Sequence, residues 1–537
     1  MGEAISRKTS LFRAGVIMPL LLIVIVWLML VFPGHPKDFT LHTLLRFPLE
    51  LPAILLALVF APIAFRSWVS GLLVAMLAML LLMRLADIGS YLAFNRKFNP
   101  LLELHLVSDG WNLVSTSVGP AQAIIIATAA LGLLLLFVRL LYKCMLQIAG
   151  CSTGHRKKLI RIALPALLFG SAGLLANNHF ELGSNISAGT LPEMHQRLTH
   201  LHSSIVDQQK FVEQLQRDEV LDVVEPQFTA LKGKDVIVLF IESYGRGYLD
   251  AERFTNHSHN LLEHVEDELY EAGLSAKSGW IESPIRGGRS WLAHASFQSG
   301  LKINNQARYD RLITTDRDSL SALFNRAGWR SSGVMPAIQF DWPESEWYGY
   351  ELLYESEDLG YDGERFGYVT MPDQYTLSHF ENSIRHSDES PVMATIALLS
   401  THAPWTPLPN ILDWDEIGDG SIFDGSQRFG ERISWRYRSK VQDMYMQSFD
   451  YTFNVIGEYL SRYADDGVII VLGDHQPAPI INGWGKSGDV PIHFITRDKS
   501  LLERLPRNHW TPGMIPSADK ASLRMWEART FLATEFE

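Results

Sequence analysis

The stretch Asp235–Gly245, which reads DVIVLFIESYG, decides the fold of the larger part of this chain. Six consecutive apolar residues, Val236 to Ile241, are rich in β-branched side chains and end at the carboxylate of Glu242. A short and uniformly apolar run predicts a strand buried on both faces, as in a parallel sheet covered by helices. Such sheets bind ligands beyond the carboxyl ends of their strands, so Glu242 is a candidate site residue.

Two further apolar runs, Val392–Leu399 and Gly467–Leu472, also end in titratable residues. From residue 232 onward, apolar strands alternate with amphipathic helical stretches, which predicts an α/β domain with a mainly parallel sheet. The carboxyl ends of parallel strands share one edge of the sheet, so residues far apart in sequence converge there. The candidates at this edge are Glu242, His402, Asp474 and His475.

Two carboxylates and an imidazole form a donor set that suits Mn²⁺, Zn²⁺ or Mg²⁺ and does not choose among them. A candidate nucleophile is Ser290, which follows Gly287-Gly-Arg289 and opens a run predicted to be helical. The amide dipoles of a helix N-terminus favour an anion, and a coordinated metal would lower the pKa of the hydroxyl group further. The alternative is an ordinary N-cap serine after a glycine turn.

The first third of the chain has a different composition. Residues 1–179 carry 15 Lys and Arg against 6 Asp and Glu, whereas residues 180–537 have a net charge of −21. Since phosphate backbones bind basic patches, the acidic part argues against a nucleic-acid partner. Both cysteines, Cys144 and Cys151, lie in the basic part, so the acidic part has no disulfide framework and no cysteine-based site.

Five apolar segments in the basic part predict membrane-spanning helices, for which about 20 residues suffice. They cover 14–32, 50–65, 68–86, 121–142 and 160–176, of which the second and fifth are short and contain proline. Basic residues precede the first segment and crowd the loop before the fifth, so the positive-inside rule places the N-terminus in the cytoplasm. Five crossings then leave the acidic part outside. We expect a transmembrane domain over 1–179, an amphipathic helical connector over 180–231 and an extracytoplasmic catalytic domain over 232–537.

The order and spacing of four short motifs within 232–500 resemble the alkaline phosphatase/sulfatase superfamily, especially membrane-anchored lipoteichoic acid synthase-type phosphoglycerol transferases and related sulfatase-like envelope proteins. The motifs are Glu242-Ser243, Gly288-Arg289-Ser290, Ser400-Thr-His402-Ala-Pro404 and Gly473-Asp474-His475. The resemblance implies a five-helix transmembrane domain followed by a sulfatase-like α/β domain with a mainly parallel central sheet. It also implies a multi-pass protein of the bacterial cytoplasmic (inner) membrane, with its catalytic domain on the extracytoplasmic side.

The resemblance further implies one bound divalent metal, with Mn²⁺ expected ahead of Mg²⁺ or Zn²⁺. The implied ligands are Glu242, Ser290, Asp474 and His475. Ser290, where the family usually has threonine, would form a covalent phospho-enzyme, and His402 would contact the phosphoryl oxygens or protonate the leaving group. The residues expected to contact substrate are His402, Arg289, Trp342 and Trp405. Glu344 departs from the family, which has an arginine there, and Asp489 is the one obvious extra ligand, so a single metal is favoured.

The function that follows is a metal-dependent transferase that moves phosphoglycerol, or a similar phospho-headgroup, from a membrane phospholipid to an envelope glycan or lipid. One alternative is a hydrolase of phosphate or sulfate esters on the same scaffold; sulfatase action is disfavoured because the Cys/Ser-x-Pro-x-Arg signature is missing. The other is a catalytically silent, lipid-binding regulatory protein. It is disfavoured because every metal and nucleophile position carries a competent side chain.

Overall fold

The computed structural model of the 537-residue chain describes residues 21–537, except 104–109, 112–113, 116–117, 181–185, 219, 222–224, 367–368, 388, 406, 426–436 and 485–486. The chain folds as two compact units. Unit 1 contains Met1–Leu92 and Arg96–Asp207, and unit 2 contains Ala93–Asn95 and Gln208–Glu537.

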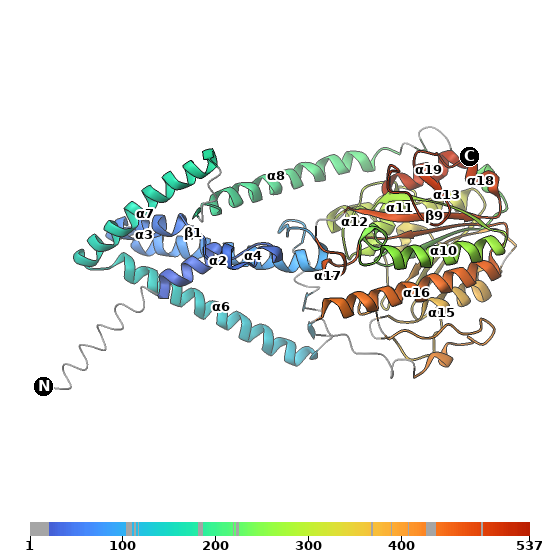
Figure 1. Cartoon of the computed structure of the whole chain (residues 1–537), viewed down its shortest axis with the longest axis horizontal. Helices are drawn as coiled ribbons and strands as arrows, with labels where there is room; N and C mark the ends of the chain where they lie inside the picture. The colour runs from blue at the N-terminus through green and yellow to red at the C-terminus, as the bar shows by residue number, and fades with distance from the viewer. Residues whose placement is uncertain are drawn as a thin grey trace. The chain divides into compact units, whose positions relative to one another are not determined.

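Unit 1 is built from apolar helices (Figure 1). Three of them, α4 (Arg66–Phe94), α6 (Pro120–Ala149) and α7 (Thr153–Phe180), contain apolar stretches long enough to cross a membrane. Two shorter apolar helices, Leu21–Val31 and α3 (Glu50–Phe60), match the first two predicted segments, although the first segment begins outside the described residues. The fifth segment, predicted to be short, is part of the longer α7, which continues through its internal proline.

Short elements complete unit 1. They are η1 (Pro36–Asp38), α2 (Leu41–Leu44), and the two-residue strands β1 (Phe47–Pro48) and β2 (Ile186–Ser187), which pair in parallel. The predicted connector contains one long helix, α8 (Thr190–Leu215), within the described residues.

Unit 2 is organised around one mixed sheet with the strand order β10-β4-β9-β8-β3-β7-β5-β6, and β11 pairs with β4. The strands are β3 (Val236–Ile241), β4 (Ser275–Glu282), β5 (Arg330–Met335), β6 (Leu352–Glu355), β7 (Val392–Leu398), β8 (Val468–Gly473), β9 (Asp489–Thr496), β10 (Trp510–Pro512) and β11 (Leu523–Arg524). The strands β8, β3, β7, β5 and β6 run parallel, whereas β9, β4 and β10 add antiparallel pairs. The mainly parallel sheet is therefore confirmed, with an antiparallel extension that the sequence did not reveal.

Alternate side chains of β3 enter two separate cores, which explains why the whole strand is apolar. Ile237, Leu239 and Ile241 pack with α10 (Thr255–Glu271), α15 (Asp373–His379) and α16 (Arg438–Tyr463). The intervening residues pack with α11 (Ser290–Ser299), α13 (Leu320–Arg326) and α19 (Ala528–Glu535). Figure 1 shows α10 and α16 on one side of β9, and α11 and α19 on the other. Unit 2 thus has three layers, with helices on both faces of the sheet.

The remaining helical elements connect these layers. They are η3 (Thr229–Leu231), α9 (Arg246–Asp250), α12 (Gln306–Leu312), α14 (Ser345–Tyr348), the π-helix η4 (Phe380–Arg385), η5 (Ser421–Phe423), α17 (Pro479–Asn482), α18 (Lys499–Glu503) and η7 (Met525–Glu527).

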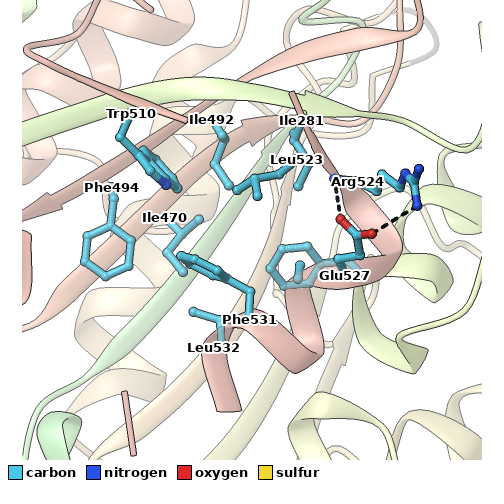
Figure 2. Close-up of a pocket in the computed structure, with 12 residues that line it drawn as sticks. Ile281, Ile470, Ile492, Phe494, Trp510, Leu523, Arg524, Glu527, Phe531 and Leu532 are labelled. Carbon is cyan, nitrogen blue, oxygen red and sulfur yellow. Dashed lines mark hydrogen bonds and ion pairs between the residues drawn. The ribbon is translucent and has the colours of Figure 1, made fainter. Parts of the chain in front are cut away.

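A small apolar hollow lies where α19 and η7 pack against the sheet (Figure 2). Ile470, Phe494, Trp510 and Phe531 line it, and an Arg524–Glu527 ion pair of 3.2 Å lies at its rim. Its volume of about 20 Å³ leaves room for about one water molecule. The hollow is therefore a packing gap in the core and not a substrate site.

Candidate metal and nucleophile site

Glu242, Asp474 and His475 form a compact group, termed here the Glu–Asp–His cluster. Parallel pairing aligns Ile241 at the end of β3 with Gly473 at the end of β8, so the residues that follow these two strands lie side by side. One ligand atom of each residue lies within 4.8 Å of the others. The edge of the sheet therefore brings together three of the four predicted metal ligands.

Ser290 supplies the fourth predicted ligand from the N-terminus of α11. Its hydroxyl group donates to Oε2 of Glu242 at 2.8 Å, and its Oγ lies 3.3 Å from Nε2 of His475. Ser290 is partly exposed, whereas Glu242, Asp474 and His475 are at most 8 % exposed. A substrate approaching from solvent would therefore reach the hydroxyl group before the buried cluster.

Hydrogen bonds fix the orientation of the cluster. Oδ1 of Asp474 accepts the backbone N–H groups of Ser243 and His475 at 2.8 and 2.6 Å. Nδ1–H of His475 donates to the carbonyl oxygen of Gln476 at 2.8 Å, so Nε2 faces the two carboxylates. Outer partners of this kind orient the first ligands of metal sites.

The charges of the cluster strongly perturb its titration. Burial, together with the negative charge of Glu242, raises the pKa of Asp474 to about 8. Burial also acts to raise the pKa of Glu242, but neighbouring His475 more than offsets it and holds that pKa well below its ordinary value. Burial acts to lower the pKa of His475, yet Asp474 and Glu242 raise it to about 9. The cluster therefore attracts positive charge.

A divalent cation fits this arrangement. Two buried carboxylates, an imidazole whose Nε2 faces them and a hydroxyl group converge on one point. Such a mixed oxygen and nitrogen set suits Mn²⁺, Mg²⁺ or Zn²⁺, and a cation would relieve the repulsion between Glu242 and Asp474. Glu242, Ser290, Asp474 and His475 are the residues that would hold it.

The backbone beside these residues is strained. Among the described residues, five non-glycine residues have positive φ, and three of them lie beside site residues: Ser243 (φ 60°), Arg289 (φ 65°) and Trp405 (φ 65°). Left-handed backbone at non-glycine residues is uncommon and concentrates at functional sites. At Gly473, a Cβ atom would lie 1.9 Å from the carbonyl oxygen of Tyr244, so the close approach of the two loops requires glycine.

The loop that carries His402 is tied to the cluster. The hydroxyl group of Thr401 donates to the carbonyl oxygen of Glu242 at 2.7 Å. His402 is half-buried, and its Nδ1–H donates to the carbonyl oxygen of Ala403 at 2.5 Å. Its charge also contributes to the low pKa of Glu242. His402 therefore lies close enough to influence the site electrostatically.

A buried aspartate, Asp373, holds the start of the same loop. Its Oδ1 accepts the N–H groups of Leu399 and Ser400 at 2.7 and 3.0 Å, and its Oδ2 accepts the hydroxyl group of Thr452 at 2.7 Å. The sequence did not decide the role of Asp373. It also gave no reason to select Thr401, although Thr401 is part of the His402 motif.

The predicted substrate-contacting residues have different surroundings. Arg289 is buried and immediately precedes Ser290. Trp342 is half-buried and lies 5.1 Å from the ring of Tyr348. Trp405 is only 3 % exposed, and its indole packs edge-on against Tyr445. Substrate contact by these residues stays a prediction, and for Trp405 the observed contacts are those of a core residue.

Asp489 and His294, two further titratable residues, have structural partners. Asp489, the one extra ligand suggested by the sequence, lies outside the cluster and forms an ion pair of 3.2 Å with Arg246. His294 is buried one turn after Ser290, and its ring lies 4.1 Å from that of Phe240. Burial lowers the pKa of His294 to about 4. Neither residue adds a ligand to the cluster.

No protein-family model and no curated protein matches this chain. Solved structures to which this chain is similar include the lipoteichoic acid synthase LtaP from Listeria monocytogenes, with a TM-score of 0.35 and 14% identity over 50% of this chain and 67% of that chain. A protein of the alkaline phosphatase superfamily from Vibrio parahaemolyticus has a TM-score of 0.37 and 13% identity over 58% and 68% of the two chains.

The lipooligosaccharide phosphoethanolamine transferase EptA from Neisseria meningitidis, an integral membrane protein, is similar over 96% of this chain and 95% of its own. Its TM-score is 0.43 and its identity 12%. Function is inferred from the residues of the Glu–Asp–His cluster and Ser290.

Proposed function

We propose that unit 2 is a metal-dependent phosphotransferase that moves phosphoglycerol, or a similar phospho-headgroup, from a membrane phospholipid to an envelope glycan or lipid. The observation that carries this proposal is the hydrogen bond of 2.8 Å from the Ser290 hydroxyl group to Glu242, within a cluster suited to a divalent cation. A lipid donor is favoured because unit 1 contains helices long enough to hold the chain in a bilayer.

The proposed cofactor is one divalent metal, Mn²⁺ ahead of Mg²⁺ or Zn²⁺. When bound by Glu242, Ser290, Asp474 and His475, it would neutralise the carboxylates and lower the pKa of the serine hydroxyl group. No second metal is proposed, since Asp489 is engaged by Arg246.

In the first step, Ser290 Oγ attacks the phosphorus atom while its proton passes along the existing hydrogen bond to Glu242. The Oγ–P bond forms as the P–O bond to diacylglycerol breaks, and His402 gives a proton to the departing oxygen. In the second step, an acceptor hydroxyl group attacks the phosphoserine and loses its proton to His402. The Oγ–P bond then breaks, and Glu242 returns the proton to Ser290. Arg289 and Trp342 are proposed to contact the substrate.

A diacylglycerol-release assay tests this function. The full chain in phospholipid vesicles with Mn²⁺ should release diacylglycerol, and Ser290→Ala should abolish the release. Ser290→Thr keeps a hydroxyl group and should retain part of the activity. Ser500→Ala, at an exposed serine of α18, is the matched control. No release from the wild-type protein, or equal release from Ser290→Ala, would refute the proposal.

Hydrolysis is the second candidate, because the partial exposure of Ser290 would also allow water to reach a phosphoserine. The two reactions differ in their response to an acceptor. Transfer predicts that an added glycan or lipid acceptor speeds turnover and becomes labelled. Hydrolysis predicts free phospho-headgroup at a rate that is independent of the acceptor.

The proposed topology is a five-helix transmembrane domain over 1–179, a connector over 180–231 and an extracytoplasmic catalytic domain over 232–537, in the bacterial cytoplasmic membrane. The native cysteines provide a test, since both lie between the fourth and fifth proposed spans. In intact cells, a membrane-impermeant maleimide should leave Cys144 and Cys151 unlabelled. It should label Ser500→Cys made in a cysteine-free chain. Labelling of the native pair in intact cells would contradict this topology.

A further inference from the structure

Unit 1 contains a polar cavity of about 390 Å³ among its apolar helices. This volume lies in the range of roughly 300–1,000 Å³ that is typical of small-molecule sites. The charged residues that line it are Asp38, Arg46, Arg84, Asp87, Lys97 and Glu193. None of them belongs to the Glu–Asp–His cluster, so the cavity is a feature separate from the proposed catalytic site.

The inner wall of the cavity is an ion-pair network that neutralises itself. Nη1 of Arg84 donates to the carbonyl oxygens of Met29, Leu30 and Phe32, at the end of the helix Leu21–Val31. Nε and Nη2 of Arg84 donate to Glu193 at 3.1 and 2.8 Å. Arg197 joins Glu193 to Asp87 at 2.9 and 2.5 Å. Two arginines and two carboxylates thus offset one another, and this wall is structural.

The remaining charged side chains are not neutralised in this way. Arg46 is exposed and has no side-chain hydrogen bond or ion pair to another described residue. Nζ of Lys97 donates to the amide oxygen of Gln196 at a long 3.5 Å, and Asp38 is exposed without an ion-pair partner in the described part of the chain. Two cations and one carboxylate therefore face the cavity. A phosphodiester beside Arg46 and Lys97, with an ammonium or hydroxyl donor beside Asp38, would complement them.

The position of the cavity along α4 supports a phosphodiester ligand that belongs to a membrane lipid. The apolar stretch of α4 runs between Arg66 and Arg84, which at 1.5 Å per residue is about 27 Å. That length is close to the hydrocarbon thickness of a bilayer, roughly 30 Å. Arg84, Asp87 and Tyr91, which line the cavity, therefore lie at the level of the phospholipid head groups.

We propose that this cavity binds the phosphodiester head group of a bilayer phospholipid. Arg46 and Lys97 are the phosphate ligands, and Asp38 favours head groups that carry a hydrogen-bond donor. The Arg84–Glu193–Arg197–Asp87 network keeps the cavity open by holding the ends of the Leu21–Val31 helix and α4 to the start of α8.

Two variants of the full chain test the proposal by different routes. Arg46→Ala/Lys97→Ala removes the phosphate ligands. Gly189→Leu fills the cavity, since Gly189 lines it and a Cβ there would meet no atom within 4 Å. The matched control is Lys157→Ala/Lys158→Ala, which removes two exposed lysines of α7 that do not line the cavity. All variants carry Ser290→Ala, so that binding is measured without turnover and does not depend on the proposed catalytic activity.

Binding is measured on purified full-length protein by native mass spectrometry with added dihexanoyl phosphatidylethanolamine, dihexanoyl phosphatidylglycerol or inorganic phosphate. The parent and the lysine control should each retain one phospholipid per chain, and the two cavity variants should bind it about tenfold or more weakly. Equal retention by the parent and Arg46→Ala/Lys97→Ala refutes the proposal even if Gly189→Leu fails to fold. Competition by inorganic phosphate as strong as that by the short lipids would show a free-anion site and would also overturn it.

Discussion

Substitution of Asp373 tests how the loop that carries His402 is held. The Asp373 carboxylate is buried and accepts hydrogen bonds from the N–H groups of Leu399 and Ser400 and from the hydroxyl group of Thr452. Asp373→Ala leaves both N–H groups buried without their acceptor, which costs about 1–3 kcal/mol each, or about 2–6 kcal/mol in total. Asp373→Asn keeps an oxygen for both N–H groups and should cost only about 1 kcal/mol.

Burial raises the pKa of Asp373, so keeping it ionised is itself unfavourable, and the neutral asparagine avoids that penalty. Unit 2 extends from Gln208 to Glu537. With an unfolding entropy of about 2.1 cal/mol/K per residue, Asp373→Ala should lower its Tm by about 3–9 °C. A loop displaced by about 1 Å would reduce turnover by on the order of 100-fold. The loss should fall on kcat more than on KM.

The assay combines thermal unfolding of the full chain with diacylglycerol release by wild type, Asp373→Ala, Asp373→Asn and Thr452→Val. The threonine variant removes one of the three hydrogen bonds and is the matched control, with an expected cost of about 1 kcal/mol. Full activity and an unchanged Tm in Asp373→Ala would refute the positioning role. An equal loss of kcat in the Asn and Ala variants would show that the negative charge matters, and not the hydrogen bonds.

Gly473→Ala is expected to abolish diacylglycerol release, because its Cβ would lie 1.9 Å from the carbonyl oxygen of Tyr244; near-wild-type turnover would contradict this. Burial lowers the pKa of His493 to about 3. Since an unfolded histidine titrates near pH 6.5, the unfolded state binds more protons below that pH, and stability falls by up to about 1.4 kcal/mol per unit towards pH 3. His493→Gln should therefore show a shallower fall of Tm between pH 6.5 and 4, and identical slopes would refute the assignment. Chelation by EDTA should lower the Tm of the wild-type protein more than that of Glu242→Gln, and a wild-type Tm insensitive to both EDTA and added Mn²⁺ would argue against a bound cation.

The sequence predicted the central strands because their signal is local. The runs that became β3, β7 and β8 are almost entirely apolar, with Thr395 as the one polar residue, and every position in them is buried. The titratable residues at their ends follow from the same pattern. Glu242, Asp474 and His475 converge because parallel strands share an edge.

The antiparallel extension could not be predicted in the same way. The strand β4 reads SAKSGWIE and mixes polar residues and glycine with two large apolar side chains. Its stability comes from pairing with β9 and from buried contacts such as the hydrogen bond of 2.7 Å between Oγ of Ser278 and Nδ1 of His493. Both depend on residues more than 200 positions away. The role of Asp373 could not be predicted for the same reason, since its three donors come from the loop after β7 and from α16.

The central position of β3 has a consequence for how the chain acquires its structure. β3 comes first among the strands of its sheet, but its two neighbours, β7 and β8, begin about 160 and about 230 residues later. Pairings of such high contact order form slowly, and an apolar strand that waits for partners is prone to aggregate. During synthesis, the strand β3 (VIVLFI) has no strand to pair with until β7 emerges. It is paired along both edges only after β8 follows. Chains truncated before β8 should therefore accumulate as aggregates or chaperone-bound species, and not as partly active enzyme.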